Sequence, residues 1–194
     1  SINVYTNTEG ASQLPSDETE KQLFIIEQLH EQMQADYART GKKKTYHVVT
    51  FGCQMNARDS EKLAGILERI GYVETDTEDA DFVIYNTCTV RENANLRVYG
   101  RLGQMKRTKQ RHPDMLIALC GCMMQEPLVV DKIRKSYRHV DIIFGTHNIF
   151  KLAELIQTRL NTGKMVVDIW KDTNQIVEDL PNERKYSFKT GVNI

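Results

Sequence analysis

The sequence is poor in the residues that stabilise small secreted proteins or mark membrane proteins. Its 194 residues include four cysteines, four prolines and one tryptophan. No apolar run approaches the roughly 18 residues that a membrane-spanning helix needs, and the amino terminus has no signal-peptide pattern. Four cysteines without an export signal favour a reducing compartment, where such residues serve metal binding or catalysis more often than disulfides. We therefore expect a cytoplasmic protein that does not enter a membrane.

The sequence also lacks net charge. Its 26 basic and 26 acidic residues cancel, so no overall attraction to nucleic acid or to an anionic membrane is expected. The charge is nevertheless unevenly distributed. Residues 1–40 contain seven acidic and two basic residues, whereas residues 91–111 contain seven basic residues and one acidic residue. The basic stretch is predicted to be a helix face that is either solvated or in contact with RNA or a neighbouring domain.

Short apolar runs alternate with amphipathic helical patterns along most of the chain. The predicted strands lie at residues 46–51, 82–85, 115–122, 140–144 and 165–170, and helical patterns follow each of the first four. Such alternation is typical of βαβ units. It predicts an α/β fold: a three-layer sandwich with a five-stranded, mainly parallel sheet, plus an N-terminal helical extension.

The predicted chain has three parts. Residues 1–44 are an N-terminal arm and a helix, capped by Ser16 or Asp17, with an apolar stripe for burial made by Ile26, Leu29, Met33 and Tyr37. Residues 45–170 are the α/β domain, and residues 171–194 are a linker and one more strand. That last strand begins at Tyr186 and the sequence stops within its alternating pattern, which indicates a fragment of a longer protein.

Three cysteines stand at the ends of predicted strands. Cys53, Cys88 and Cys122 each follow an apolar run and precede a helical pattern, and Thr89 and Glu92 have the spacing of a capping box. The carboxyl ends of parallel strands meet at one edge of a sheet, where open α/β folds keep their sites. The amino ends of the following helices favour negative charge there. The pattern favours a metal cluster held by three thiolates.

Other uses of the cysteines remain open on this pattern. Cys120 lies inside an apolar run and is predicted to be a packed core side chain. Four thiolates would suit structural zinc, although Cys120 and Cys122 are spaced less favourably than a Cys-x-x-Cys pair. A disulfide is a further alternative. A phosphate or flavin site would need a glycine-rich first loop, and residues 52–56 do not form G-x-G-x-x-G. The alternative function is a non-catalytic α/β binding module with structural zinc or a nucleotide at the strand ends.

Three motifs give the chain a specific resemblance. Residues 50–61 (TFGCQMNARDSE), 86–92 (NTCTVRE) and 121–126 (GCMMQE) are similar to the three cysteine motifs of the amino-terminal domain of radical-SAM methylthiotransferases. The similarity covers about residues 45–165, and Phe144-Gly-Thr146 is a further match. The Gln-Met-Asn and Val-Arg-Glu variants within the first two motifs resemble the tRNA branch, which makes 2-methylthio-N6-isopentenyladenosine next to the anticodon.

This resemblance implies a cofactor, a substrate and partners. Cys53, Cys88 and Cys122 would be the metal ligands of an auxiliary 4Fe–4S cluster, while Cys120 has no assigned role. The family acts on tRNA as a transferase that adds a methylthio group to C2 of adenine. Its radical-SAM domain holds a second 4Fe–4S cluster and S-adenosylmethionine.

This chain departs from the family pattern in two ways. It lacks the radical-SAM Cys-x-x-x-Cys-x-x-Cys motif and any carboxyl-terminal RNA-binding domain. Residues 186–194 resemble the entry strand of the radical-SAM domain. The resemblance therefore implies that the enzyme needs its missing domains and that this chain alone contains no catalytic residue and is inactive.

Overall fold

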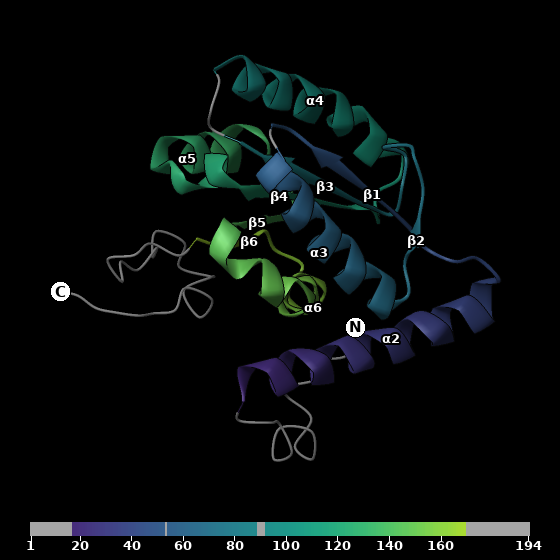
Figure 1. Cartoon of the computed structure of the whole chain (residues 1–194). Coiled ribbons are helices and arrows are strands. Elements are labelled where there is room, and N and C mark those ends of the chain that lie inside the picture. The colour runs from purple at the N-terminus through teal and green to yellow at the C-terminus, as the bar shows by residue number, and fades with distance from the viewer. Residues whose placement is uncertain (1–16, 53, 89–91, 170–194) are drawn as a thin grey trace.

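The structure is a computed structural model that describes residues 17–52, 54–88 and 92–169. Within these residues, strands alternate with helices after an amino-terminal helix (Figure 1). The helices are α2 (Glu18–Thr40), α3 (Gln54–Ile70), α4 (Glu92–Arg111), α5 (Pro127–Ser136) and α6 (Leu152–Thr162), with the 3-10 helices η1 (Cys122–Gln125) and η2 (Thr146–Lys151). The strands are β1 (Thr45–Thr50), β2 (Val73–Glu74), β3 (Phe82–Thr87), β4 (Leu116–Gly121), β5 (Ile142–Phe144) and β6 (Val166–Asp168). Among the described helices, none is both long and apolar enough to cross a membrane.

The described strands form one sheet in the order β2-β1-β3-β4-β5-β6, and every neighbouring pair is parallel. The predicted α/β class is confirmed, but the described sheet has six strands instead of five. The apolar pattern does not predict β2, because that edge strand has only two residues and both are exposed. The chain passes from β1 outward to β2 and then returns to β3 on the other side of β1. This reversal makes a switch point between β1 and β3, where open α/β sheets bind ligands.

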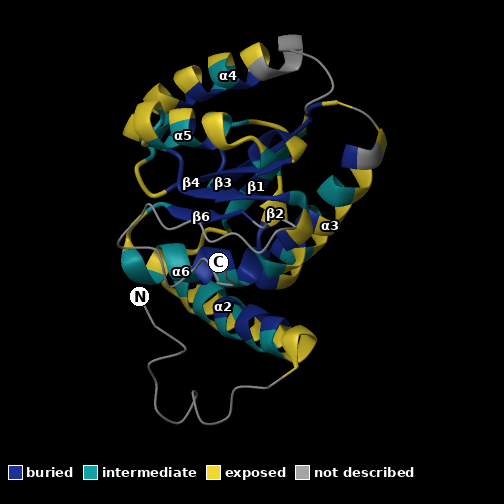
Figure 2. Cartoon of the chain, turned by 90° about the vertical axis from the view of Figure 1, so that its left-hand side faces the viewer, coloured by how far each residue is buried: buried dark blue, intermediate teal, exposed yellow. Residues whose placement is uncertain are grey.

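Helices cover both faces of the sheet, as Figures 1 and 2 show. The central strands β3 and β4 are buried at all six positions, as expected for strands covered on both sides. On one face, α3 and α6 contribute Leu63, Leu67, Leu152 and Ile156 to a core with Ile84 and Ala118. On the other face, α4 and α5 contribute Val98, Leu102, Val130 and Ile133 to a core with Val83 and Ile117. The predicted three-layer arrangement is confirmed.

The helix α2 packs on α3 and α6 instead of on the sheet (Figure 1). Asp17 caps it, because its carboxylate accepts a hydrogen bond of 3.2 Å from the Glu20 N–H. The predicted apolar stripe is buried at Ile26 and Leu29, but Tyr37 remains 45% exposed. The prediction extended the stripe too far, because helical periodicity does not show where the surface beneath a helix ends.

Local boundaries also differ from the predicted ones. Asn86 and Thr87 were predicted to break the strand that precedes Cys88, yet both are fully buried residues of β3. The helical pattern that follows the predicted strand at residues 140–144 begins as the 3-10 helix η2, and its α-helical part starts at Leu152. The predicted arm, capping residue Thr89 and terminal strand from Tyr186 lie outside the described residues.

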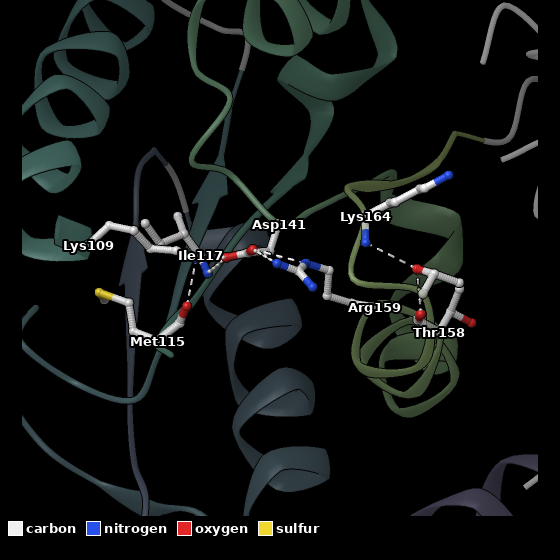
Figure 3. A network of polar contacts seen from close by, with 8 residues as sticks. Lys109, Met115, Ile117, Asp141, Thr158, Arg159 and Lys164 are labelled. Atoms are coloured by element: carbon white, nitrogen blue, oxygen red, sulfur yellow. Dashed lines mark hydrogen bonds and ion pairs between the residues drawn. The ribbon is translucent and has the colours of Figure 1, made fainter. Parts of the chain in front are cut away.

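A charged network ties the layers together at the amino ends of β4 and β5. Asp141 is 3% exposed and lies between Lys109 of α4 and Arg159 of α6 (Figure 3). Its Oδ2 is 2.5 Å from the Lys109 Nζ, its Oδ1 is 2.9 Å from an Arg159 nitrogen, and the Ile117 N–H donates to Oδ2 at 2.8 Å. Lys109 also donates to the Met115 carbonyl. One carboxylate thus joins a helix from each face to the sheet.

Candidate functional site

Three neighbouring strands end at the edge of the sheet where the cysteines were predicted to meet. Thr87 pairs with Gly121 in the β3–β4 ladder, so Cys88 and Cys122 follow directly paired positions. On the other side of β3, β1 ends shortly before Cys53, which lies outside the described residues. The structure therefore brings two of the three predicted ligands to one edge.

The loop after β1 lies directly against Cys88. Gly52 has a φ of +111°, a conformation that favours glycine. A methyl group added to Gly52 would lie 2.5 Å from the Cβ and 2.9 Å from the Sγ of Cys88. The backbone immediately before Cys53 thus touches the Cys88 side chain. Only glycine permits this approach.

Gly121 likewise permits a close approach of the backbone, here between β4 and β3. Its φ is +103°, and an added Cβ would lie 2.2 Å from the Thr87 carbonyl oxygen and 2.6 Å from the Thr87 nitrogen. The chain therefore turns out of β4 while remaining packed against β3. This turn places Cys122 at the start of η1, where it is exposed.

A buried hydrogen-bond network lies beneath this edge. The Asn86 side chain donates to the Asn56 carbonyl at 2.8 Å and to the Ser60 hydroxyl at 3.0 Å. In return, the Asn56 amide donates to the Thr87 carbonyl at 2.8 Å. The Thr87 hydroxyl donates to the Cys120 carbonyl at 2.7 Å. Because buried polar groups are costly unless paired, these bonds hold the start of α3 and the ends of β3 and β4 in one arrangement.

The described thiols occupy different environments. Cys120 is fully buried within the core, and its thiol donates weakly to the Asn86 Oδ1 at 3.7 Å. Burial raises the pKa of the Cys120 thiol, and the nearby charges of Asp59 and Cys122 raise it further. Cys88 is 5% exposed and Cys122 is exposed. The position of Cys120 agrees with its predicted role as a packed side chain.

Positive charge from α4 reaches the end of β1. Phe51, the residue before Gly52, is 1% exposed. The guanidinium carbons of Arg97 and Arg101 lie 5.8 and 5.9 Å from the centre of its ring, within the range of a cation–π contact. Arg101 also forms an ion pair with Glu78, whereas Arg97 is exposed.

The supporting residues Asn56, Ser60 and Asn86 were not predicted from the sequence. The sequence pattern predicts Asn56 in the loop after the first strand and Asn86 just beyond the second, because asparagine is common in turns, and it assigns Ser60 no structural role. The available signal was their position within the two motifs that contain Cys53 and Cys88. Their partners lie about 30 positions apart in the chain, so only the fold shows the pairing.

The described cysteines at this edge could ligate a thiophilic metal. Among the described residues, no group of three or more His, Cys, Asp or Glu side chains is arranged to hold a metal. Two thiols at one edge and a glycine loop packed on one of them nevertheless provide soft donors and close backbone approach, which suit thiolate ligation of iron. The predicted ligand set of Cys53, Cys88 and Cys122 stays a prediction.

Comparison with known proteins identifies the family. A family model described as "Uncharacterized protein family UPF0004" matches residues 45–145. The chain belongs to this family. The match begins at β1 and ends directly after β5, so it contains all three strand ends of the candidate site.

Curated relatives support a narrower relationship. The chain is 71% identical over 154 residues to a protein of Lachnoclostridium phytofermentans named tRNA-2-methylthio-N(6)-dimethylallyladenosine synthase, covering 79% of this chain and 34% of the relative. A protein of Clostridioides difficile with the same name is 50% identical over 182 residues, covering 93% of this chain and 38% of the relative. The chain is thus homologous to the amino-terminal region of these enzymes and spans about a third of their length.

Proposed function

We propose that this chain is the auxiliary iron–sulfur domain of a tRNA methylthiotransferase, with Cys53, Cys88 and Cys122 as the ligands of a 4Fe–4S cluster. One observation carries the proposal. Cys88 and Cys122 follow the paired strand ends Thr87 and Gly121, while the backbone that leads to Cys53 rests on Cys88. The homology to methylthiotransferases supports the choice of an iron–sulfur cluster over other thiolate sites.

Each iron of such a cluster needs one outside ligand, so three thiolates leave one iron open to a sulfur donor. The protein's own contribution is to position the thiolates. Gly52 and Gly121 let the loops approach closely, and the Asn56–Asn86 hydrogen bonds hold the loops in register. Cys122 is exposed and therefore lies on the side that a substrate or a second domain can reach.

The complete protein is proposed to add a methylthio group to C2 of N6-isopentenyladenosine beside the anticodon of tRNA, in the cytoplasm. It would use S-adenosylmethionine and a second 4Fe–4S cluster in a radical-SAM domain that this chain does not contain. We therefore expect the 194-residue chain alone to produce no methylthio-adenosine from a tRNA substrate and S-adenosylmethionine. Mass spectrometry of the digested RNA tests this expectation, and detection of product from the isolated chain would contradict it.

The ligand assignment is tested with four single variants. The chain and its Cys53→Ala, Cys88→Ala, Cys122→Ala and Cys120→Ala variants are reconstituted anaerobically with iron and sulfide and then desalted. Wild type and Cys120→Ala should each retain roughly four iron atoms per chain with a broad visible absorption band. The other three should retain almost none, because two thiolates hold a cubane poorly against solvent.

Cys120→Ala is the matched control, because it removes a thiol two residues from Cys122 without removing a proposed ligand. Circular dichroism should show that all four variants are folded. Loss of iron from Cys120→Ala with retention by Cys122→Ala would refute the assignment. A colourless protein that binds one zinc ion through these thiols would favour a structural zinc module instead.

A further inference from the structure

The two helical layers have opposite charge. On one face of the sheet, α4 and α5 together contain nine basic residues and two acidic ones. The helices on the other face, α2, α3 and α6, contain six basic residues and nine acidic ones. The zero net charge of the chain therefore conceals a strongly positive layer. Such asymmetry is the electrostatic signature of a surface that binds a polyanion.

Part of this positive charge is used inside the protein. Arg101 pairs with Glu78, and Lys109 pairs with Asp141. In contrast, Lys106, Arg107 and Arg111 are exposed, and within the described part of the chain no acidic side chain forms an ion pair with them. The second half of α4 thus presents three uncompensated cations to solvent.

These cations create a positive field that buried neighbours also experience. His139, between α5 and β5, donates a hydrogen bond of 2.7 Å from its Nε2 to the Leu102 carbonyl. Burial lowers the pKa of His139, and the charges of Lys106 and Lys109 lower it further, against the raising effects of that hydrogen bond and of Asp141.

The outer surface of α4 also contains two glycines. Its inward side is defined by Val98, Leu102 and Met105, which are buried, so helical geometry places Gly100 and Gly103 on the outward side with Arg107. No described atom lies within 4 Å of a Cβ added at either glycine. Figure 2 shows the same outward side of α4 as exposed.

Packing among the described residues therefore does not explain two glycines in a helix interior. Each glycine disfavours the helix by about 1 kcal/mol relative to alanine. Their physical effect is to leave the helix backbone uncovered between charged side chains, so that another backbone can approach closely.

We propose that the outer face of α4 binds the sugar–phosphate backbone of the substrate RNA, with Lys106, Arg107 and Arg111 contacting phosphates and Gly100 and Gly103 allowing close approach. This rests on the proposed function, because RNA is the polyanion that such an enzyme handles. The basic side chains span up to about 21 Å along the helix from Arg97 to Arg111. Helix α4 begins four residues after Cys88. Lys106, Arg107 and Arg111 lie near its other end, where Lys109 contacts Asp141 at the amino ends of β4 and β5, so the RNA segment bound by these cations lies away from the candidate site.

The test uses the reconstituted 194-residue chain and a fluorescently labelled anticodon stem-loop that contains N6-isopentenyladenosine. Anisotropy gives Kd at several salt concentrations. Arg107→Glu/Arg111→Glu should weaken binding at least tenfold and reduce the slope of log Kd against log salt by about 1 to 2, because phosphate contacts release counterions. Lys62→Glu/Arg69→Glu on α3 changes net charge equally and should leave both quantities near wild type.

A second pair of variants separates binding from stability. Gly103→Gln should raise the melting temperature, because glutamine is a better helix former than glycine, and should weaken RNA binding at least threefold. Gly65→Gln is the matched control, because Gly65 is an exposed glycine of α3 with nothing within 4 Å of an added Cβ. It should raise the melting temperature without changing RNA binding.

The outcomes distinguish this proposal from the proposed function. Full iron content with no RNA binding by wild type, or with an unchanged Kd in Arg107→Glu/Arg111→Glu, overturns the α4 surface alone. Equal weakening by the α3 charge reversal also overturns it, since the effect would then be one of net charge. Absence of iron from reconstituted wild type would overturn the proposed function, whatever the RNA result.

Discussion

The two edges of the sheet use polar residues in opposite ways. At the amino edge, Asp141 contacts Lys109, Arg159 and a backbone N–H. Its negative charge is balanced inside the fold by the two basic side chains. At the carboxyl edge beside the described cysteines, the uncharged Asn56 and Asn86 hold the loops and Cys122 is exposed. The buried, charged Asp168 lies farther along this edge, at the end of β6. The amino edge is thus closed by side chains. The carboxyl edge leaves the Cys122 thiol available at the surface.

This difference shows how one sheet separates stability from function. Removing one partner of a buried ion pair leaves the other charge buried and unpaired, so such a pair is best placed away from a site that binds metal. Neutral amides can hold loops without placing a fixed charge next to a site that binds metal. This difference predicts that changes at the amino edge affect mainly folding and that changes at the carboxyl edge affect mainly cluster loading.

The largest effect on stability is expected at Asp141. Asp141→Ala leaves Lys109 and Arg159 without their shared partner and removes the acceptor of the Ile117 N–H. The free energy of unfolding should fall by about 4 kcal/mol, measured by urea denaturation. Iron per folded chain after reconstitution should remain unchanged. A variant that loses iron while keeping its stability would reverse the proposed roles of the two edges.

Gly121→Ala should lower the free energy of unfolding slightly less than Asp141→Ala does. The added methyl group would collide with the Thr87 backbone at a positive φ, so the free energy of unfolding should fall by about 3 kcal/mol, and iron loading should also fall. Gly163→Ala is the control. Gly163 has a φ of +71° with nothing within 4 Å, so strain alone should cost about 1 kcal/mol. Equal losses of stability in the two variants would show that the close approach to Thr87 is unimportant.

Asn56→Ala tests the neutral network. It removes the donor to the Thr87 carbonyl, and a buried acceptor left unpaired costs about 2 kcal/mol. Because the loops should then be less well ordered, the reconstituted cluster should decay faster in air than in wild type. Stability is measured by denaturation, and decay by visible absorbance. An unchanged decay rate together with reduced stability would indicate that Asn56 supports only the fold.

The smallest effect should be the pH dependence caused by His139. Its pKa is lowered in the folded protein, chiefly by burial, so the unfolded chain binds a proton more readily. The contribution of neutral His139 to stability is present above about pH 6.5 and is lost as pH falls through the lower folded pKa. His139→Gln should reduce the slope of stability against pH in that acidic range. An identical slope in both proteins would contradict this assignment.

Much of the fold could be predicted because local patterns determine it. Apolar runs of several residues marked the strands β1, β3 and β4. Apolar residues at helical spacing, such as Leu63 and Leu67, marked the helices. Strand β2 lacked such a signal, because two exposed edge residues need no apolar pattern. The burial of Asn86 was also not predictable. Its hydrogen-bond partners lie in α3, and the contact depends on β3 pairing with β1.

The sequence by itself determined the alternation of strands and helices, the cysteine motifs and the position of Cys120 within an apolar run. These features depend on residue type and on spacing over a few positions. Only the tertiary structure decided that Gly52 rests on Cys88, that Asp141 joins helices from both faces, and that the positive charge gathers on one layer. The physical reason is distance along the chain: contacts between residues dozens of positions apart depend on strand order and register, which no local pattern specifies.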